Sequence, residues 1–152
     1  MKNKKNGKRI NISTTEPQAF KAMLGLEGYL SKIEISQTLK ELAKIRASQI
    51  NNCAYCISMH TKDAIKNGER PERIFLLSAW REATKFFTEE EQTILAMTEE
   101  VTLIHQNGLS EETYNKASEI FSENQIAQII MLIVTINGWN RIALSTHLEI
   151  ED

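Results

Sequence analysis

The two cysteines of the chain, Cys53 and Cys56, are separated by two residues, and His60 follows the second cysteine by four positions. If this segment is helical, a rotation of about 100° per residue places the three side chains within roughly 60° of one another. Two thiols and an imidazole on one helix face have the composition of a thiol redox site. The sequence therefore predicts redox chemistry at this segment, provided that a helix holds it.

The two thiols are expected to differ in reactivity. An ordinary thiol has a pKa of about 8.5, and only the thiolate is a good nucleophile. A helix N-terminus favours an anion and acts most strongly on Cys53, whereas His60, one turn beyond Cys56, favours the thiolate of Cys56. Because a base within reach is the more directed effect, we predict that Cys56 is the nucleophile and Cys53 its resolving partner. Residues three apart in a first helical turn have Cα atoms about 5–6 Å apart, which also permits a disulfide.

Two other interpretations of the motif stay open. A zinc ion needs four ligands, and the motif supplies three, so His105, His147 or a neighbouring subunit would have to complete the site. The histidine spacing does not favour this arrangement, and we predict no bound metal. The cysteines could also be two small buried residues, with His60 a hydrogen-bonded helix residue.

Composition favours one soluble globular domain that spans residues 1–152. Hydrophobic residues make up 41% and charged residues 25%, and the formal charge of -2 gives no support to nucleic-acid binding. No apolar run approaches the roughly 20 residues that span a bilayer, and no signal peptide is evident. Only two cysteines in a chain of this size do not form a secreted disulfide scaffold and are more typical of a reducing compartment. We therefore predict a cytoplasmic protein without membrane or nucleic-acid partners. The one basic cluster lies in residues 1–13, which we expect to be flexible: Lys2, Lys4, Lys5, Lys8 and Arg9.

The scarcity of proline and glycine, two and six residues, together with abundant leucine, isoleucine, alanine, glutamate and lysine, predicts an all-α fold. The apolar periodicity divides the chain into a bundle of about seven helices. Their expected ranges are about 17–28, 37–50, 53–67, 71–85, 89–108, 111–121 and 126–146.

Local signals set the ends of these helices. Ser36 is expected to cap the second helix, and Asn52 to cap the third, which carries the cysteines and ends at Gly68 as a C′ glycine. The segments 88–91 and 122–125 each read as a capping box.

The last helix combines an apolar stretch with polar residues on one face. The stretch from Ile129 to Ile136 is apolar nearly all round, as in a domain core or an oligomer interface. Asn137, Asn140 and Arg141 share one face of this helix, and buried polar groups require partners. We expect them to form structural hydrogen bonds across helices or at an interface rather than to contact substrate.

The run Glu41-x11-Cys53-x2-Cys56-x3-His60 resembles the signature of the AhpD-like alkylhydroperoxidases, within the carboxymuconolactone decarboxylase superfamily. The flanking residues 48–56 and 59–64 are similar as well. Segments 79–82 and 136–141 resemble parts of its small single-domain members, and the resemblance covers about residues 20–144. Each of these two segments holds a tryptophan, Trp80 and Trp139, which we expect in the core rather than at a ligand.

The resemblance implies an AhpD-like helical bundle and a dithiol peroxidase. In such a protein, Cys56 is the peroxidatic thiol, and Cys53 condenses with its sulfenic acid to form a disulfide. His60 and Glu41 would form a proton relay, through water, that deprotonates Cys56; Glu41 enters the site through the resemblance alone. The expected substrate is a hydroperoxide or another small oxidant. No cofactor is expected, and a thioredoxin-like or lipoyl-bearing protein would supply the reducing dithiol to a homo-oligomer, a trimer or hexamer.

The sequence also departs from this pattern. The best-known peroxidases of the family carry a histidine immediately before the second cysteine, where this chain has Tyr55, and they contain a duplicated helical unit, where this chain has one copy. Two alternatives follow. One is a lyase or isomerase of the decarboxylase branch, which would use His60 and Glu41 without thiol cycling. The other is a redox-sensing oligomer without catalytic turnover.

Overall fold

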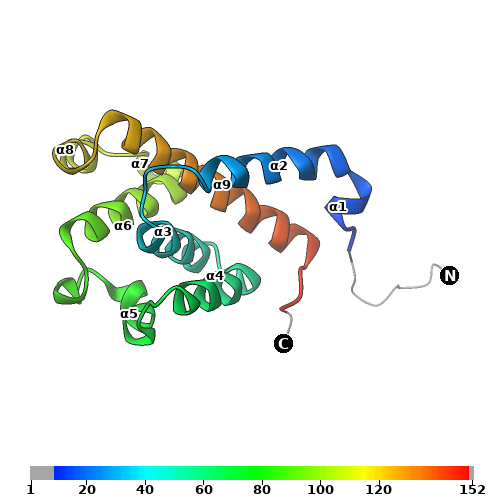
Figure 1. The fold of residues 1–152 in the computed structure, drawn as a ribbon, viewed down its shortest axis with the longest axis horizontal. Coiled ribbons are helices and arrows are strands. Elements are labelled where there is room, and N and C mark those ends of the chain that lie inside the picture. Colours follow the sequence, from blue (N-terminus) through cyan, green and yellow to red (C-terminus); the bar gives the residue numbers. More distant parts are fainter. Residues whose placement is uncertain (1–8, 151–152) are drawn as a thin grey trace.

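The computed structural model describes residues 9–150, and every regular element in that range is a helix (Figure 1). The predicted all-α class is therefore confirmed, and the seven longer α-helices match the expected number. Nine α-helices and two short 3-10 helices follow one another in this part of the chain: α1 Ile12–Thr15, α2 Pro17–Leu30, α3 Gln37–Ile50, α4 Ala54–Lys66, α5 Pro71–Leu76, η1 Leu77–Ala79, η2 Thr84–Phe86, α6 Glu89–Thr102, α7 Ile104–Asn107, α8 Glu111–Ile120 and α9 Glu123–Thr146.

The N-terminal segment expected to be flexible is described only in part. Its residues 12 and 13 belong to α1, and the guanidinium of Arg9 donates a hydrogen bond to the carbonyl oxygen of Ser145 over 2.9 Å. Lysines 2, 4, 5 and 8 of the basic cluster lie outside the described residues.

Most of the predicted helix ends are confirmed. The Ser36 hydroxyl accepts a hydrogen bond from the Leu39 amide at the start of α3, and both predicted capping boxes, at Thr88 and at Ser122, are reciprocal. Gly68 follows α4 with a φ of 93°, as a C′ glycine does. Short-range hydrogen bonding therefore locates most of these boundaries.

Two helices end earlier than their sequence patterns indicate. The fourth helix was expected to reach about residue 85, but α5 ends at Leu76 and the chain continues through η1 and η2. This segment buries Leu77, Trp80 and Phe87 in one cluster with residues of α3, α4 and α6, which requires the chain to turn. The fifth helix was expected to reach Gly108, but α6 ends at Thr102 and α7 follows as a separate turn of helix.

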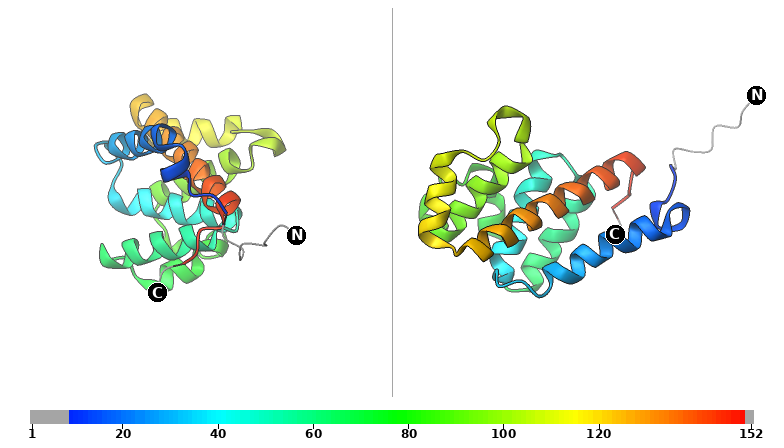
Figure 2. Two further views of the ribbon diagram at one scale, coloured as in Figure 1. Left: turned by 90° about the vertical axis from the view of Figure 1, so that its right-hand side faces the viewer. Right: turned by 90° about the horizontal axis from the view of Figure 1, so that it is seen from above.

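Helix α3 is the central element of the bundle. It packs against α4, α6 and α9, while α2 runs beside α9 on the outside (Figures 1 and 2). One apolar cluster fills the space between α3, α6, α8 and α9, and a second lies among α3, α4, α5, η1 and α6. Because α3 is covered on several sides, polar residues along it are enclosed by the fold.

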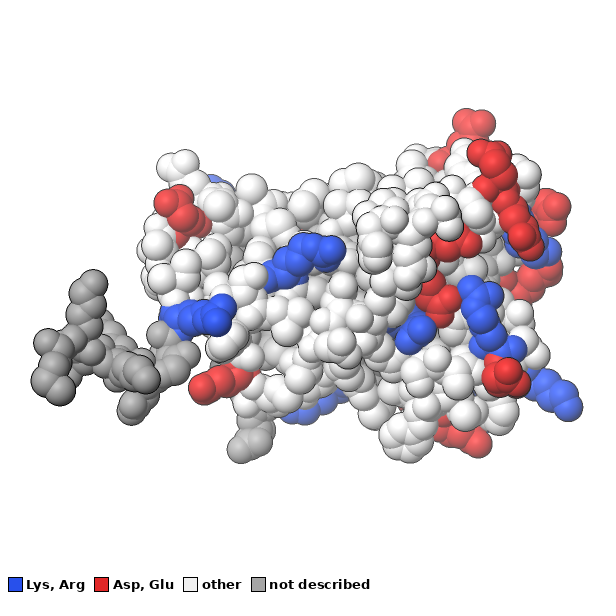
Figure 3. All heavy atoms as spheres, turned by 180° about the vertical axis from the view of Figure 1, so that it is seen from behind, with Lys and Arg blue, Asp and Glu red and all other residues white. Residues whose placement is uncertain are grey.

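Helix α9 is long and apolar enough, by length and composition alone, to cross a membrane. Half of its most apolar 18-residue segment is buried inside the protein, however, as in the core helix of a globular fold. Ile129, Leu132, Ile133 and Ile136 all lie in the core, so the core interpretation accounts for most of the apolar stretch. The oligomer interface stays a prediction. On the face shown in Figure 3, acidic and basic side chains are interspersed with large uncharged areas.

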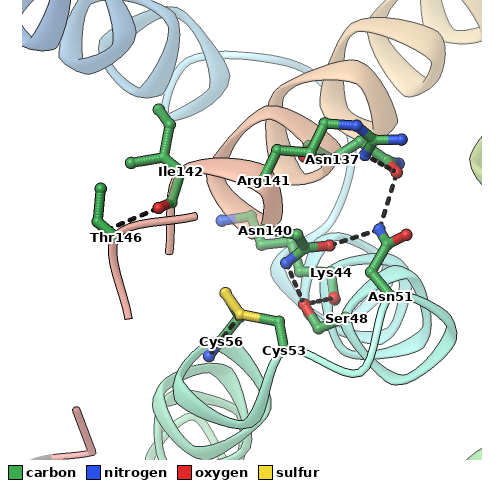
Figure 4. Close-up of a disulfide and its surroundings, with 10 residues drawn as sticks. All are labelled: Lys44, Ser48, Asn51, Cys53, Cys56, Asn137, Asn140, Arg141, Ile142 and Thr146. Carbon is green, nitrogen blue, oxygen red and sulfur yellow. Dashed lines mark hydrogen bonds between the residues drawn. A yellow bond between two sulfur atoms is a disulfide. The ribbon is translucent and has the colours of Figure 1, made fainter. Parts of the chain in front are cut away.

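The polar residues of α9 form a network with the end of α3 (Figure 4). The Asn51 amide donates to the side-chain oxygens of Asn137 and Asn140, each over 2.9 Å, and the Asn140 amide donates to the Ser48 hydroxyl over 3.0 Å. Arg141 donates to the backbone and side-chain oxygens of Asn137. The predicted structural role of these residues is confirmed.

The core position predicted for Trp80 is also confirmed. Its indole N–H donates a hydrogen bond to Glu99 over 2.8 Å. Burial raises the pKa of Glu99, but hydrogen bonds from Trp80, Arg81 and Arg46 outweigh burial and hold the pKa below its usual range. This carboxylate thereby ties α6 to α3 and to the segment after η1.

We expect Asn140→Ala to lower the free energy of unfolding by about 1–3 kcal/mol, because it removes the hydrogen bonds that Asn140 makes with Ser48 and Asn51 in the interior. Asn140 is 0% exposed, which leaves no solvent to replace these bonds. Chemical denaturation measures the loss. Asn115→Ala, at an exposed position of α8, serves as the control and should change stability by less than about 0.5 kcal/mol. Equal stabilities of the two variants would contradict the role of the network.

Candidate active site

The chain reverses sharply between α3 and α4, and this turn sets the start of the cysteine helix. Cys53, not Asn52, is the N-cap of α4, so the predicted cap was wrong by one residue. The Cys53 amide donates to the carbonyl oxygen of Ser48 over 3.0 Å, which closes a tight turn and places Asn52 in the left-handed region with a φ of 54°. Asparagine tolerates this conformation, so its role here is in the turn and not in the cap.

Cys53 and Cys56 form a disulfide, with Cα atoms 5.3 Å apart (Figure 4). This agrees with the separation expected for the first turn of a helix. Sγ of Cys53 also accepts the backbone N–H of Cys56 over 3.3 Å, as the side chain of an N-cap residue does. The two residues are 1% and 3% exposed and pack against Ala143 of α9 and the ring of Tyr55.

A cavity of about 400 Å³ gives access to one of the two sulfur-bearing residues. Cys56 and His60 line it, whereas Cys53 and Glu41 lie behind its wall. Its volume falls within the range of small-molecule sites. At one edge, the chain turns back after α9 through the left-handed residue His147, and Leu148 joins the wall. The remaining residues of the wall come from α2, α3, α4 and α9: Phe20, Glu27, Lys44, Tyr55, Met59, Asp63, Trp139 and Ala143.

His60 meets Glu41 across the interface between α4 and α3. Nδ1 of His60 lies 3.2 Å from Oε2 of Glu41, and the two residues are 7% and 4% exposed. The contact is close enough for an ion pair if the imidazole is protonated, but it is not aligned as a hydrogen bond, and within the described residues neither atom has a hydrogen-bond partner. Gln37 donates to the other carboxylate oxygen over 2.7 Å, which fixes the orientation of Glu41.

All four predicted site residues are therefore brought together. Cys53 and Cys56 are bonded, Cys56 and His60 share a cavity, and His60 contacts Glu41. A carboxylate beside an imidazole stabilises its protonated form, and an imidazole beside a thiol can accept its proton. Buried polar atoms without partners are suited to hold an ordered water or to exchange a proton.

Part of the site was not predicted from the sequence. Lys44 and Glu27 line the cavity and approach each other, with Nζ 3.9 Å from Oε2. Trp139 was expected in the core, but it is only half-buried and forms part of the cavity wall, so this prediction was wrong. Its indole N–H donates to Oε1 of Glu27 over 2.9 Å, and its ring meets Phe20 edge-on with centroids 5.6 Å apart.

The sequence contained a signal for only one of these residues. Lys44 follows Glu41 by three positions, which places both on one face of α3. Glu27 lies on α2, and no spacing rule connects that helix with the cysteines. As for the metal-binding alternative, residues 9–150 contain no group of three or more His, Cys, Asp or Glu side chains placed to hold a metal ion.

The fold and the site together define a class: an all-α, single-domain protein with a CxxC disulfide beside a buried histidine and glutamate. The sequence profile described as the Carboxymuconolactone decarboxylase family matches residues 17–100. The uncharacterized protein YdfG of Bacillus subtilis is 39% identical over 137 residues, which cover 90% of this chain and 92% of YdfG. The chain therefore belongs to the carboxymuconolactone decarboxylase family.

Solved structures show the same fold. The crystal structure of ATU0492 from Agrobacterium tumefaciens, a protein of unknown function described as a candidate antioxidant defence protein AhpD, matches with a TM-score of 0.91 and 35% identity over 95% of this chain and 99% of that one. The debrominase Bmp8 matches with a TM-score of 0.78 and 20% identity over 89% of this chain and 72% of Bmp8. An uncharacterized peroxidase-related protein from Silicibacter sp. TM1040 matches with a TM-score of 0.76 and 20% identity, over 88% and 70% of the two chains. The last two likenesses concern the fold alone.

The left-handed turn before Cys53 leads to a prediction about stability. Asn52→Val should lower the free energy of unfolding by about 1–2 kcal/mol, because a β-branched side chain clashes with the backbone at positive φ. Asn52→Gly is the matched control at the same position and should stay within about 0.5 kcal/mol of the parent, because glycine adopts this conformation freely. Thermal or chemical unfolding of the two variants tests the assignment. A valine variant as stable as the glycine variant would contradict it.

Proposed function

We propose that the protein is a thiol-dependent peroxidase that reduces hydroperoxides through the Cys53–Cys56 pair. The observation that carries the proposal is the unequal placement of the two cysteines. Cys56 lines the cavity together with His60, whereas its disulfide partner is buried behind the wall. This arrangement supports Cys56 as the attacking thiol and Cys53 as the resolving thiol.

The reaction begins with the reduced pair. His60, oriented by Glu41, accepts the proton of Cys56, and the thiolate attacks one oxygen of the hydroperoxide. A sulfur–oxygen bond forms, the oxygen–oxygen bond breaks, and the leaving alkoxide takes a proton to become an alcohol. The thiol of Cys53 then attacks the sulfenic sulfur of Cys56, and water leaves as the disulfide forms. One hydroperoxide has been reduced by two electrons, and the thiol pair has supplied them.

An external dithiol returns these two electrons by thiol–disulfide exchange. A thioredoxin-like protein or a lipoyl-bearing protein has the required chemistry, and no bound cofactor is needed. We propose further that the protein acts as a cytoplasmic homo-oligomer. Tyr55 packs against the disulfide at the position where the best-known peroxidases of the family have histidine, so His60 is left as the imidazole of the motif.

Family membership and the description of the Agrobacterium relative as a candidate antioxidant defence protein support this proposal. The family also includes the decarboxylase branch, whose chemistry would use His60 and Glu41 without thiol cycling. The contact between these two residues suits either reaction, and the disulfide favours the peroxidase.

The proposal is tested by hydroperoxide consumption with dithiothreitol as the reductant. We expect turnover of cumene hydroperoxide by the parent protein and a loss of at least about a hundredfold in Cys56→Ser, because the nucleophile is removed. Cys53→Ser should still form a sulfenic acid at Cys56, which a dimedone adduct detected by mass spectrometry would reveal. Equal rates for the parent and Cys56→Ser would overturn the proposal.

The same variants separate the alternatives. Activity on a lactone or keto-acid substrate that survives replacement of both cysteines would indicate the lyase or isomerase. Reversible disulfide formation with a change in oligomeric state, but without turnover, would indicate a redox sensor.

A further inference from the structure

Lys44 places a positive charge in the cavity that holds Cys56. Its side chain is 12% exposed and reaches the cavity from α3, one turn after Glu41. Glu27 is its ion-pair partner, but the separation of 3.9 Å is longer than a hydrogen bond. The ammonium is therefore held loosely, and its charge is not fully engaged by Glu27.

Glu27 is held more firmly than Lys44. Its other carboxylate oxygen accepts the indole N–H of Trp139 over 2.9 Å, and Trp139 is packed edge-on against Phe20. The carboxylate is thus anchored to the wall formed by α2 and α9. Lys44 lines the same cavity as Cys56 and lies beside this anchored anion.

The charge balance around Cys56 makes Lys44 distinctive. Among the described residues that line the cavity, it is the one permanent cation. Its charge is also felt along α3, because burial and then repulsion by Lys44 lower the pKa of Lys40. The α9 residues of the cavity wall, Trp139 and Ala143, are uncharged. The titratable and charged groups around the cavity come from the three other helices: Glu27 from α2, Lys44 from α3, with Glu41 against His60, and Tyr55, His60 and Asp63 from α4.

We propose that Lys44 stabilises the thiolate of Cys56 through its charge, and that Glu27 limits this effect by drawing the ammonium towards α2. Positive side chains near a cysteine favour its ionised form, and the effect is stronger in a partly buried site than in open water. Lys44 acts on Cys56 across the cavity without taking part in bond making. The inference rests on the proposed function in taking Cys56 as the attacking thiol.

The test measures thiol reactivity and needs no peroxide. The full-length protein carrying Cys53→Ser has a single thiol, and its alkylation by iodoacetamide is followed from pH 5 to pH 10. Lys44→Met should slow alkylation at pH 7 by about three- to tenfold and move the titration of Cys56 to higher pH, since one pKa unit corresponds to a tenfold change in thiolate. Lys44→Arg, which keeps the charge, should restore the rate.

Glu27→Gln provides a test of opposite sign. Its amide oxygen can still accept the Trp139 hydrogen bond, but the negative charge is lost. We expect alkylation at pH 7 to rise by about two- to fivefold, because the negative charge of Glu27 then no longer offsets the charge of Lys44. Lys32→Met, at an exposed position between α2 and α3, removes one positive charge away from the cavity and should leave the rate unchanged.

Two outcomes would overturn the inference: an alkylation profile of Lys44→Met that matches that of the Cys53→Ser parent, or a Glu27→Gln variant that reacts no faster than this parent. Circular dichroism verifies that each variant is folded. If Lys44→Met does not fold, Lys44→Gln replaces it, and the Glu27→Gln result decides independently. A protein that fails to consume peroxide but shows these shifts would refute the proposed function and retain the role of Lys44.

Discussion

The two-residue reversal at Asn51 and Asn52 is the constraint on which the site depends. Because the chain turns there, α4 runs back along α3, and residues at similar distances from the turn meet. Glu41 lies ten residues before Asn51 and His60 eight residues after Asn52. At 1.5 Å per helical residue, these intervals correspond to about 15 and 12 Å, so the two side chains reach the same level of the helix pair. The spacing between the glutamate and the histidine therefore follows from the geometry of a helical hairpin.

Burial gives this contact its chemical significance. The carboxylate of Glu41 and the imidazole of His60 are enclosed because α3 is covered by three other helices. Removing these groups from water is unfavourable unless they interact with each other, and the surrounding protein screens their interaction less than solvent would. Gln37 satisfies one oxygen of Glu41 and leaves the other facing the imidazole. The polar network of Asn140, Ser48 and Asn51 then secures the turn against α9, so the disulfide and the histidine have a common support.

Local rules predicted the framework of the structure well. Caps at Ser36, Thr88 and Ser122 depend on hydrogen bonds within four residues, and sequence spacing alone reveals them. The helical motif of Cys53, Cys56 and His60 is local for the same reason. The predictions from sequence failed where contacts between distant parts of the chain determine the local structure. The sequence predicts Asn52 as a cap, but its role in the turn depends on how α3 and α4 meet. The sequence also predicts a longer α5 than is observed, since the burial of Trp80 and Phe87 bends the chain after Leu76. Part of the cavity wall comes from α2 and α9, and no local pattern relates these two helices to the cysteines.

On the proposed function, the difference in access between the two cysteines would also govern the order of events during turnover. Cys56 faces the cavity and Cys53 does not. On the proposed function, the hydroperoxide and the reducing dithiol must therefore approach the same sulfur atom by the same route, and neither can bind while the other occupies it. The two half-reactions would alternate in a ping-pong cycle. An excess of either reagent would inhibit the reaction of the other by occupying the cavity. On this proposal, the cavity is the binding site for both reagents, and access to it sets the sequence of the two half-reactions.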